Sequence, residues 1–417
     1  PSHIKEGRFG EWLRNNVDWA VSRERYWGTP LPIWRCSECN NLDCIGNLHE
    51  LESKVAPSQK PRISNLDLHR PHIDLIQIPC SNCGSTMTRI PEVADAWFDS
   101  GAMPFSQWDY PVKLPTPTGT LVINNIEELL NSPYYPADFI TEAIDQTRGW
   151  FYSLLAESVL FDPASRPSFQ NVIVLGLILD ENGEKMSKSK GNVVSPETII
   201  EEYGADSLRW YLYTAAPTGV ARRFSSGLVQ ESLRRFFLTL WNTYSFFITY
   251  ASIDGFIPSD HYEFWEKRHP GPGINIDLPN ELDRWVISEL NTLVIEVTTA
   301  FENYNPTDAG RRIEDFVDLL SNWYVRRSRR RFWKSENDTD KKLAYLSLYS
   351  CLLTLSKLIA PMSPFLADYM YSNLSQGNFE QSVHIETWPT GNSRLVDNDL
   401  SIATRLAMRI ASFNMNA

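Results

Sequence analysis

A continuous apolar run followed by a lysine-rich loop constrains the fold of this 417-residue chain more than any other feature. Residues 172–179 read VIVLGLIL, are rich in β-branched side chains and lie between polar segments. Such a run is typical of a strand buried on both faces, as in a parallel sheet. Asn182-Gly183 then predicts a tight turn. Ser195-Pro196-Glu197 predicts a helix start, and Gly204 predicts its end. We therefore expect α/β structure around the intervening loop.

The loop at 185–192 reads KMSKSKGN and holds three lysines. Ligands of open α/β sheets bind at the carboxyl edge of the strands, so lysines there can surround a polyphosphate. Loop hydroxyls and amides add hydrogen bonds, and the lysines would stabilise charge that develops on phosphate oxygens during transfer. The alternative is a solvated basic loop without a ligand. The strand–loop–helix context favours the phosphate-binding hypothesis.

Five of the six cysteines lie in the first quarter of the chain. Cys36-x-x-Cys39 and Cys80-x-x-Cys83 predict two knuckles that together offer four thiolates to a structural Zn²⁺ ion. The gap between the pairs is long, so we assume an insertion, and Cys44 could replace one ligand. Free or redox-active cysteines are the alternative. Cys351 lies in an apolar run and is expected to be a plain core residue.

The second half of the chain is predicted to be helical. Residues 254–280 are rich in Pro, Gly and Asp and are expected to form a linker, whereas 281–375 predict three or more long amphipathic helices. Residues 323–334 (WYVRRSRRRFWK) hold six basic residues, four aromatic residues and no acid. Such a run can bind RNA phosphates and bases, or it can be an aromatic core face beside a solvated, salt-bridged basic face. We expect Trp323 and Trp333 to be mostly packed. Arg222-Arg223 is a weaker candidate for nucleic-acid contact.

Charge and length set broad limits. The net charge of −12 argues against non-specific coating of nucleic acid, although it leaves room for local basic patches. The length predicts about three domains. No window approaches the roughly 18 consecutive apolar residues of a membrane span, so no membrane association is expected. The first residues have no apolar core typical of a signal peptide.

At 185–192 the chain resembles the KMSKS signature of the class I aminoacyl-tRNA synthetases. Residues 18–30 (DWAVSRERYWGTP) and 139–151 (FITEAIDQTRGWF) resemble the isoleucyl members of that family, and 95–101 (DAWFDSG) also matches, without an assigned mechanism. The resemblance covers essentially the whole chain. It implies α/β plus all-α structure: the second half of a Rossmann-like catalytic domain over 1–215 with a zinc-knuckle insertion within 36–83, a helical connector and linker over 216–280, and an α-helical anticodon-binding bundle over 281–417.

The resemblance also implies an activity: ATP-dependent activation of L-isoleucine and its transfer to tRNA(Ile), in the cytoplasm, by a monomer. Lys185 and Lys188 would be catalytic and bind the ATP phosphates, with Mg²⁺ accompanying the ATP. The remaining implied site residues are Ser187 and Ser189 at the ATP, Glu142, Asp145 and Gln146 at the ribose and aminoacyl end of the adenylate, Trp27 and Trp150 in the isoleucine pocket, and Arg326, Arg327, Arg330 and Arg331 at the tRNA.

Two positions depart from the family pattern. Ala143 stands where the family usually has Gly, and Leu175 stands where it usually has His. The chain also has no His-x-Gly-His tetrapeptide and no candidate editing segment. We therefore expect a C-terminal section of a longer enzyme, inactive in isolation. A valyl enzyme and a non-catalytic tRNA-binding module are the alternatives. The relative rates of activation of valine and isoleucine, and the sequence upstream of Pro1, would discriminate them.

Overall fold

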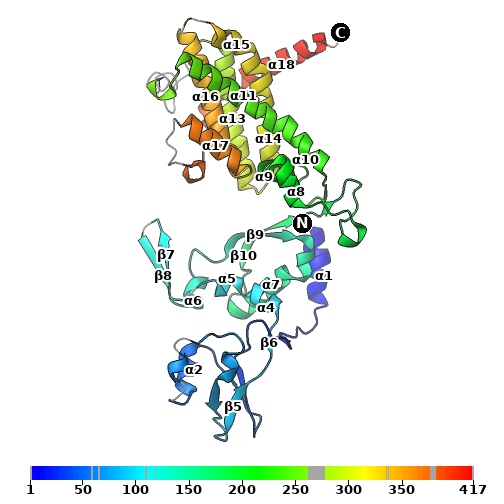
Figure 1. The fold of residues 1–417 in the computed structure, drawn as a ribbon, viewed down its shortest axis with the longest axis vertical. Coiled ribbons are helices and arrows are strands. Elements are labelled where there is room, and N and C mark those ends of the chain that lie inside the picture. Colours follow the sequence, from blue (N-terminus) through cyan, green and yellow to red (C-terminus); the bar gives the residue numbers. More distant parts are fainter. Residues whose placement is uncertain are drawn as a thin grey trace. The chain divides into compact units, whose positions relative to one another are not determined.

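The computed structural model describes residues 2–57, 60–63, 66–108, 110–117, 119–261, 278–334, 336, 338–375 and 382–415. Two compact units divide the chain, residues 1–174 and residues 175–417, and each has its own hydrophobic core (Figure 1). The first unit combines short helices with small sheets, and the second is dominated by long helices.

The first unit carries a four-stranded antiparallel sheet of order β3-β2-β5-β4, and β9 pairs with β10 beneath α7. Trp34 and Met87 are buried in the core under the four-stranded sheet. The helices are η1 (His3–Arg8), α1 (Phe9–Arg14), α2 (Leu48–Lys54), α3 (Lys60–Ile63), η2 (Ile73–Leu75), α4 (Ala96–Gly101), α5 (Met103–Ser106), α6 (Ile126–Leu130), η3 (Ile144–Arg148) and α7 (Trp150–Phe161). The strands are β1 (Ser22–Arg23), β2 (Ile33–Cys36), β3 (Leu42–Cys44), β4 (Gln77–Pro79), β5 (Thr86–Arg89), β6 (Val93–Ala94), β7 (Val112–Thr116), β8 (Gly119–Ile123), β9 (Ala137–Ala143) and β10 (Phe169–Leu175).

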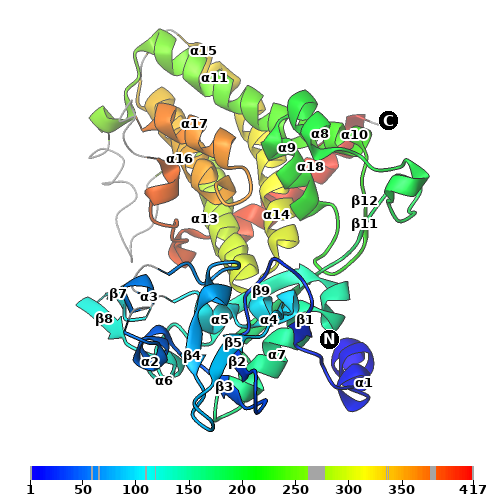
Figure 2. The ribbon, with the colours of Figure 1, turned by 60° about the horizontal axis from the view of Figure 1, so that its bottom comes forward.

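The second unit is a helical bundle in which α13 packs against α14 and α16, and α16 packs against α11 and α17 (Figure 2). Its strands are β11 (Ile178–Leu179) and β12 (Arg222–Arg223). Its helices are η4 (Lys188–Lys190), α8 (Pro196–Tyr203), α9 (Ala205–Thr214), α10 (Ser226–Ser232), η5 (Leu233–Phe237), α11 (Leu238–Asp254), η6 (Pro258–His261), α13 (Glu281–Glu302), α14 (Pro306–Leu319), η7 (Leu320–Val325), α15 (Arg326–Trp333), α16 (Thr339–Ile359), α17 (Pro364–Leu374), η8 (Val383–Ile385), η9 (Ser393–Leu395) and α18 (Asn398–Met415).

The prediction of one strand over 172–179, buried on both faces, is wrong. β10 ends at Leu175 and β11 is a separate short strand. Gly176 lies between them, and glycine is needed there because a Cβ would overlap the backbone of Val220. In the described part of the chain β10 pairs only with β9, and Val172 and Leu175 are 43% and 40% exposed. Phe169 and Val174 pack against α7, so the strand is only partly covered by neighbouring elements.

The local signals after this strand are confirmed. Gly183 adopts the left-handed φ of +86° in the turn, and the backbone N–H of Gly183 donates to the carbonyl of Asp180 at 3.0 Å. α8 starts after Ser195, with Pro196 in its first turn, and ends at Gly204, whose φ is +81°. The Ser195 hydroxyl donates to Glu197 and makes no cap bond to a backbone N–H.

β9 extends to Ala143, η3 follows it, and α7 begins at Trp150. The helices expected in 281–375 are confirmed as α13 to α17. The bundle core begins before 281, because Phe236, Leu240 and Phe247 belong to it. The expected linker over 254–280 falls largely on 262–277, which lie outside the described residues.

α16 is a central helix of the bundle. Among the described residues it is the one helix long and apolar enough to cross a membrane by length and composition alone, and 72% of its apolar window is buried inside the protein. Its buried residues include Cys351, as expected for a core cysteine. The apolar composition of α16 therefore matches its place in the bundle core.

Candidate functional site

The lysine-rich loop is held by two side chains at its base. Asp180 is buried, and its Oδ1 accepts the backbone N–H groups of Asn182 and Glu184 at 3.0 and 2.8 Å. The Asn192 amide donates to Asp180 Oδ2 at 2.8 Å, and its Oδ1 accepts the backbone N–H of Ser187 at 2.9 Å. The hydrogen bond from Asn192 lowers the pKa of Asp180. These hydrogen bonds link Asp180, which precedes the loop, to Asn192 at its end.

The three lysines of the loop have different surroundings. Lys190 is paired with Glu184 at 2.9 Å, whereas Lys185 and Lys188 are exposed and make no ion pair with any described residue. The hydroxyls of Ser187 and Ser189 lie 3.2 Å apart, and Ser187 Oγ accepts the backbone N–H of Lys190 at 3.3 Å. Two ammonium groups and two hydroxyls are thus presented together on a short loop, a set that suits phosphate oxygens.

Glu142 lies near the end of β9, and Asp145 and Gln146 lie in η3, before the start of α7. Glu142 and Asp145 are exposed carboxylates in this part of the first unit. Gln146 accepts the backbone N–H of Trp150 through Oε1 at 3.0 Å, so it satisfies a free donor at the start of α7. Its amide group lies 3.5 Å from Asp145 Oδ2. The helix start therefore fixes Gln146 next to Asp145.

The two tryptophans expected in the isoleucine pocket both belong to the first unit and differ in exposure. Trp27 is 70% exposed and stacks on His69. Trp150 is half-buried, and its indole N–H donates to the carbonyl of Ser100 at 2.9 Å. The backbone at Gly149 passes directly against Trp97, where a Cβ would lie 2.9 Å from the indole ring.

Asp95 was not singled out as a site residue, although the 95–101 motif contains it. Asp95 Oδ2 accepts the indole N–H of Trp19 at 2.9 Å and a guanidinium N–H of Arg23. Its Oδ1 accepts the backbone N–H of Trp97 at the start of α4. α4 in turn packs against α7. This buried carboxylate thus joins the 18–30 segment to the helix pair that carries Trp150.

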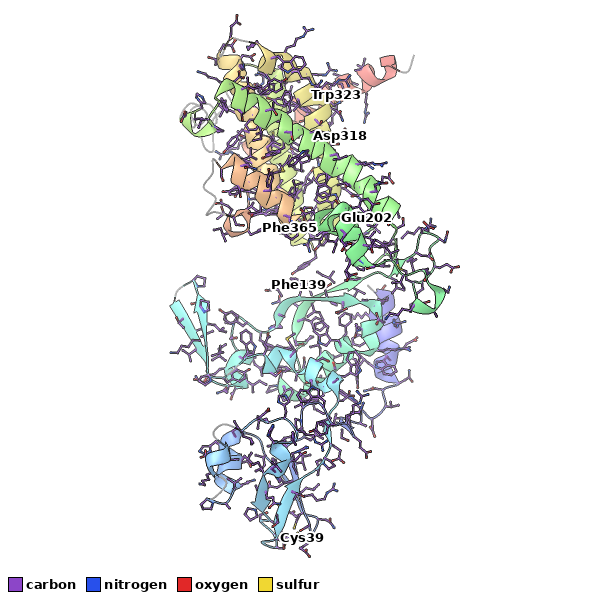
Figure 3. All side chains as sticks on the ribbon, in the orientation of Figure 1. Cys39, Phe139, Glu202, Asp318, Trp323 and Phe365 are labelled. Carbon is purple, nitrogen blue, oxygen red and sulfur yellow. The ribbon has the colours of Figure 1, made fainter. Side chains whose placement is uncertain are left out.

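The four predicted metal ligands come together at one end of the four-stranded sheet (Figure 3 labels Cys39 there). The sulfur atoms of Cys36, Cys39, Cys80 and Cys83 all lie within 4.8 Å of one another. A tetrahedral Zn²⁺ site with Zn–S bonds of ~2.3 Å requires sulfur separations of about 3.8 Å, so the cluster has the size such an ion needs. Hydrogen bonds from the backbone N–H and hydroxyl of Ser85 lower the pKa of Cys83 to about 6. A thiolate is the form that binds metal.

Cys44 does not belong to this cluster, and its suggested role as a substitute ligand is wrong. It pairs with Ile33, three positions before Cys36 on the neighbouring strand. Three residues along a strand correspond to about 10 Å. The spacing of cysteines in sequence could not reveal which end of β3 faces the knuckles.

Arg331 has a structural position, and its assignment to the tRNA surface is wrong. Its guanidinium makes two parallel hydrogen bonds of 2.7 Å to the buried carboxylate of Asp283, and a further contact of 2.8 Å to Asp340. Tyr324 also donates to Asp283 at 2.7 Å. The arginine is needed to compensate a buried charge and is not free to bind a phosphate.

The other arginines of α15 are exposed. Arg326, Arg329 and Arg330 make no ion pair with described residues, and Arg327 lies 4.2 Å above the ring of Trp323. Trp323 packs against the bundle core, as expected; Figure 3 labels it on the segment that continues α14. Trp333 is 55% exposed, so the expectation that it is mostly packed is wrong. Residues 326, 329, 330 and 333 share one helix face, which places an exposed indole beside three free guanidinium groups.

Arg222 and Arg223 also differ in their surroundings. Arg222 donates to the carbonyl of Leu212, and burial lowers the pKa of its guanidinium. Arg223 is exposed and pairs through its backbone with β11. Arg222 therefore has a structural role, contrary to its weaker assignment as a nucleic-acid contact.

The family model described as tRNA synthetases class I (I, L, M and V) matches residues 1–225. The chain belongs to this family. The model of the anticodon-binding domain of tRNA ligase matches residues 283–416, which include α14, α15, α16 and α17. The class I tRNA synthetase match thus includes the lysine loop, and the anticodon-binding match includes the exposed arginines of α15.

Relatives of this class I synthetase chain include isoleucine–tRNA ligases from several bacteria. The enzyme of Dehalococcoides mccartyi is 52% identical over 420 residues, which is 100% of this chain and 39% of the relative. That of Thermus thermophilus is 46% identical over 414 residues, which is 98% of this chain and 37% of the relative. The chain therefore spans about two fifths of the length of these relatives.

A solved structure has a similar fold. It is a ternary complex of LeuRS from Agrobacterium radiobacter K84 with tRNA and LeuAMS. The matched region includes 95% of this chain and 46% of the chain in that structure. The TM-score is 0.61 and the sequence identity is 21%, so the likeness concerns the fold.

Proposed function

We propose that the protein containing this chain activates L-isoleucine with ATP and transfers it to tRNA(Ile). The observation that carries the proposal is the identity of 46–52% with isoleucine–tRNA ligases over 98–100% of the chain. The matched region covers both units, and it therefore includes the segments that carry the lysine loop, the tryptophans and the arginines of α15. In this proposal the reaction takes place in the cytoplasm, and the enzyme is a monomer.

In this proposal Lys185 and Lys188 neutralise the phosphates of ATP, which arrives with Mg²⁺. Their ammonium groups have no acidic partner among the described residues, which supports this role. Ser187 and Ser189 add hydroxyl donors. As isoleucine attacks the α-phosphate and pyrophosphate leaves, negative charge grows on the phosphate oxygens. Donors already in place stabilise that charge at little reorganisation cost.

Glu142, Asp145 and Gln146 would hold the ribose hydroxyls and the ammonium group of the aminoacyl adenylate. Carboxylates accept hydrogen bonds from both. Trp27 and Trp150 would line the aliphatic side chain of isoleucine, since flat indoles form a shaped apolar slot. These residues make up the amino-acid end of the proposed site, within residues 1–215. Ala143, which departs from the family pattern, is the neighbour of Glu142 in sequence.

Binding of tRNA is proposed for the exposed arginines Arg326, Arg327 and Arg330, on the 281–417 anticodon-binding domain. We add Arg329 and Trp333, since the first is equally free and the second exposes a flat ring on the same face. Arginines bind phosphates, and aromatic rings stack on unpaired RNA bases. The 216–280 segment would connect this domain to the catalytic part.

The four cysteines 36, 39, 80 and 83 would hold a structural Zn²⁺ ion. Four thiolates complete a tetrahedral shell and leave no open position, so the ion would stabilise the module and would not do chemistry.

The decisive experiment is isoleucine-dependent ATP–pyrophosphate exchange by the full-length protein. We expect exchange with isoleucine to exceed that with valine by about 100-fold, the discrimination a pocket can achieve for one methylene. Faster exchange with valine would instead favour a valine–tRNA ligase. Absence of exchange together with tight tRNA binding would favour a non-catalytic tRNA-binding module.

A further inference from the structure

A segment between the two cysteine pairs covers one face of Trp27. The imidazole ring of His69 lies parallel to the indole, with ring centroids 5.1 Å apart and planes within 5°. Asp67 fixes the imidazole: its Oδ1 accepts the backbone N–H of His69 at 2.9 Å and lies 2.8 Å from Nδ1. The side chain that stacks on Trp27 is therefore itself anchored.

Two contacts beside this stack join the same segments. Arg70 donates to the backbone carbonyl of Arg25 at 3.2 Å, and its guanidinium lies 5.0 Å from the ring centre of Tyr26. Three successive positions, 25 to 27, are thus contacted by His69 and Arg70. The loop that presents Trp27 cannot move without breaking all three contacts.

The contacting segment is fixed to the four-stranded sheet that carries the cysteines. Arg70 Nε donates to Asp74 Oδ2 at 2.8 Å, and the same carboxylate accepts Arg89 Nε at 2.7 Å. Arg89 is the last residue of β5 and is buried. The ion pairs of Asp74 with Arg89 and Arg70 therefore connect the sheet to the loop that carries Trp27.

Trp27 is held on one face and remains 70% exposed. Stacking on an anchored ring sets the angle of the indole while leaving the remainder of the ring for a ligand. A pocket that separates side chains differing by one methylene depends on the position of its walls, because the discrimination is small in energy.

We propose that His69 is a positioning residue that fixes the indole of Trp27 and thereby shapes the amino-acid pocket. The inference rests on the proposed function, in which Trp27 lines the isoleucine side chain. It assigns residues 67–74, within the insertion between the cysteine pairs, a role in amino-acid binding. His69 acts through Trp27 and has no contact of its own with substrate in this proposal.

The test is His69→Ala in the full-length protein, with His72→Ala as the matched control. His72 is exposed on the same segment, and the structure gives it no ring contact with Trp27. Loss of one aromatic pair predicts a rise of about two- to ten-fold in KM for isoleucine in pyrophosphate exchange, with a smaller change in kcat. His72→Ala should leave both constants unchanged. His69→Phe keeps a flat ring but loses the contact of Nδ1 with Asp67, so it should restore KM in part.

A double variant guards against a general loss of structure. In a Trp27→Ala background, His69→Ala should have no further effect on KM, because the ring it positions is gone. An unchanged KM in His69→Ala, or an equal rise in both backgrounds, would overturn the inference. A wild-type protein that is inactive with isoleucine would refute the proposed function instead.

Discussion

Neighbouring charged residues of this chain have different surroundings, and we propose that their functions differ accordingly. Lys188 and Lys190 lie two positions apart in one loop, yet Lys190 is paired with Glu184 while Lys188 is free. A paired ammonium group is already neutralised and gains less from a phosphate. In the proposed function, the choice of Lys188 over Lys190 as the catalytic lysine therefore rests on the pairing of Lys190 with Glu184, and not on the motif alone.

We predict that Lys188→Ala slows isoleucine activation in the full-length protein by roughly 10²–10³, the scale of losing one donor to a transition state. Lys190→Ala, the matched control, should slow it by less than about ten-fold, because its charge is compensated by Glu184. Pyrophosphate exchange measures both. Equal losses of exchange rate in the two variants would contradict the proposed difference between Lys188 and Lys190.

A buried carboxyl group provides a test of stability at the same scale. Glu157 is fully buried on α7, and neither of its oxygens has a hydrogen-bond partner in the described part of the chain. Burial, with a contribution from the charge of Asp99, raises the pKa of Glu157 to about 8. The unfolded chain releases this proton near the ordinary value of 4.5, so folding retains a proton between the two values. Stability should therefore fall as pH rises from about 4.5 to about 8.

Glu157→Gln removes the ionisable group and keeps the shape. We expect the variant to match the native chain near pH 5 and to exceed its stability at pH 8 by on the order of 1–3 kcal/mol. Urea denaturation at the two pH values measures the difference, with the exposed Glu181→Gln as control. A difference that is the same at both pH values would contradict the assignment.

Among the elements, α15 shows how one helix serves two purposes. Its inner face buries Ser328 and Phe332, and Arg331 compensates Asp283 at the start of α13. Its outer face presents Arg326, Arg330 and the half-exposed ring of Trp333. The buried ion pair fixes the rotation of the helix about its axis, and that rotation decides which arginines reach solvent.

Single substitutions should separate the two faces. Arg331→Ala leaves a buried carboxylate uncompensated and should lower the free energy of unfolding by about 3–5 kcal/mol. Arg330→Ala should change it by less than about 0.5 kcal/mol. It should instead weaken tRNA binding and reduce the salt slope of log K by about one. Denaturation and tRNA titrations between about 50 and 200 mM salt measure these quantities. Reversed roles for the two arginines would contradict the face assignment.

At the scale of the whole molecule, the chain consists of two units with separate cores. The cysteine cluster lies in the first unit and contributes no residue to the bundle core. A metal ion bound by this cluster should therefore stabilise only the sheet around it. This independence follows from the absence of shared core residues in the part of the chain that the structure describes.

We predict about one Zn²⁺ per chain, lost in Cys39→Ser and retained in Cys44→Ser, since only Cys39 belongs to the cluster. Chelation should raise amide hydrogen exchange in β2, β4 and β5, while α13 and α14 keep their protection. Metal analysis and hydrogen exchange measure these effects. A chain that is free of zinc and fully protected in the sheet would exclude the site.

Sequence reasoning succeeded where the cause is local. Asn182-Gly183 and Gly204 were predicted correctly because the required backbone angles belong to those residues. The two C-x-x-C pairs, whose contacts are 41 and 47 positions apart, were predicted to meet because four thiolates at this spacing suit one metal ion. It failed where distant residues decide. Arg331 is neutralised by Asp283, 48 positions away, and the exposure of β10 depends on which elements pack over its two faces. No window of sequence contains that information.

The apolar character of α16 has a consequence for synthesis. Outside the bundle, a helix of this hydropathy would present a surface that aggregates or enters a lipid bilayer. Translation produces α11, α13 and α14 first, and these are packing partners of α16 within the bundle. By the time Thr339 leaves the ribosome, these three partners have already emerged, and α17, which also packs on α16, follows directly after it. The order of the helices along the chain thus shortens the time for which this apolar helix needs a chaperone.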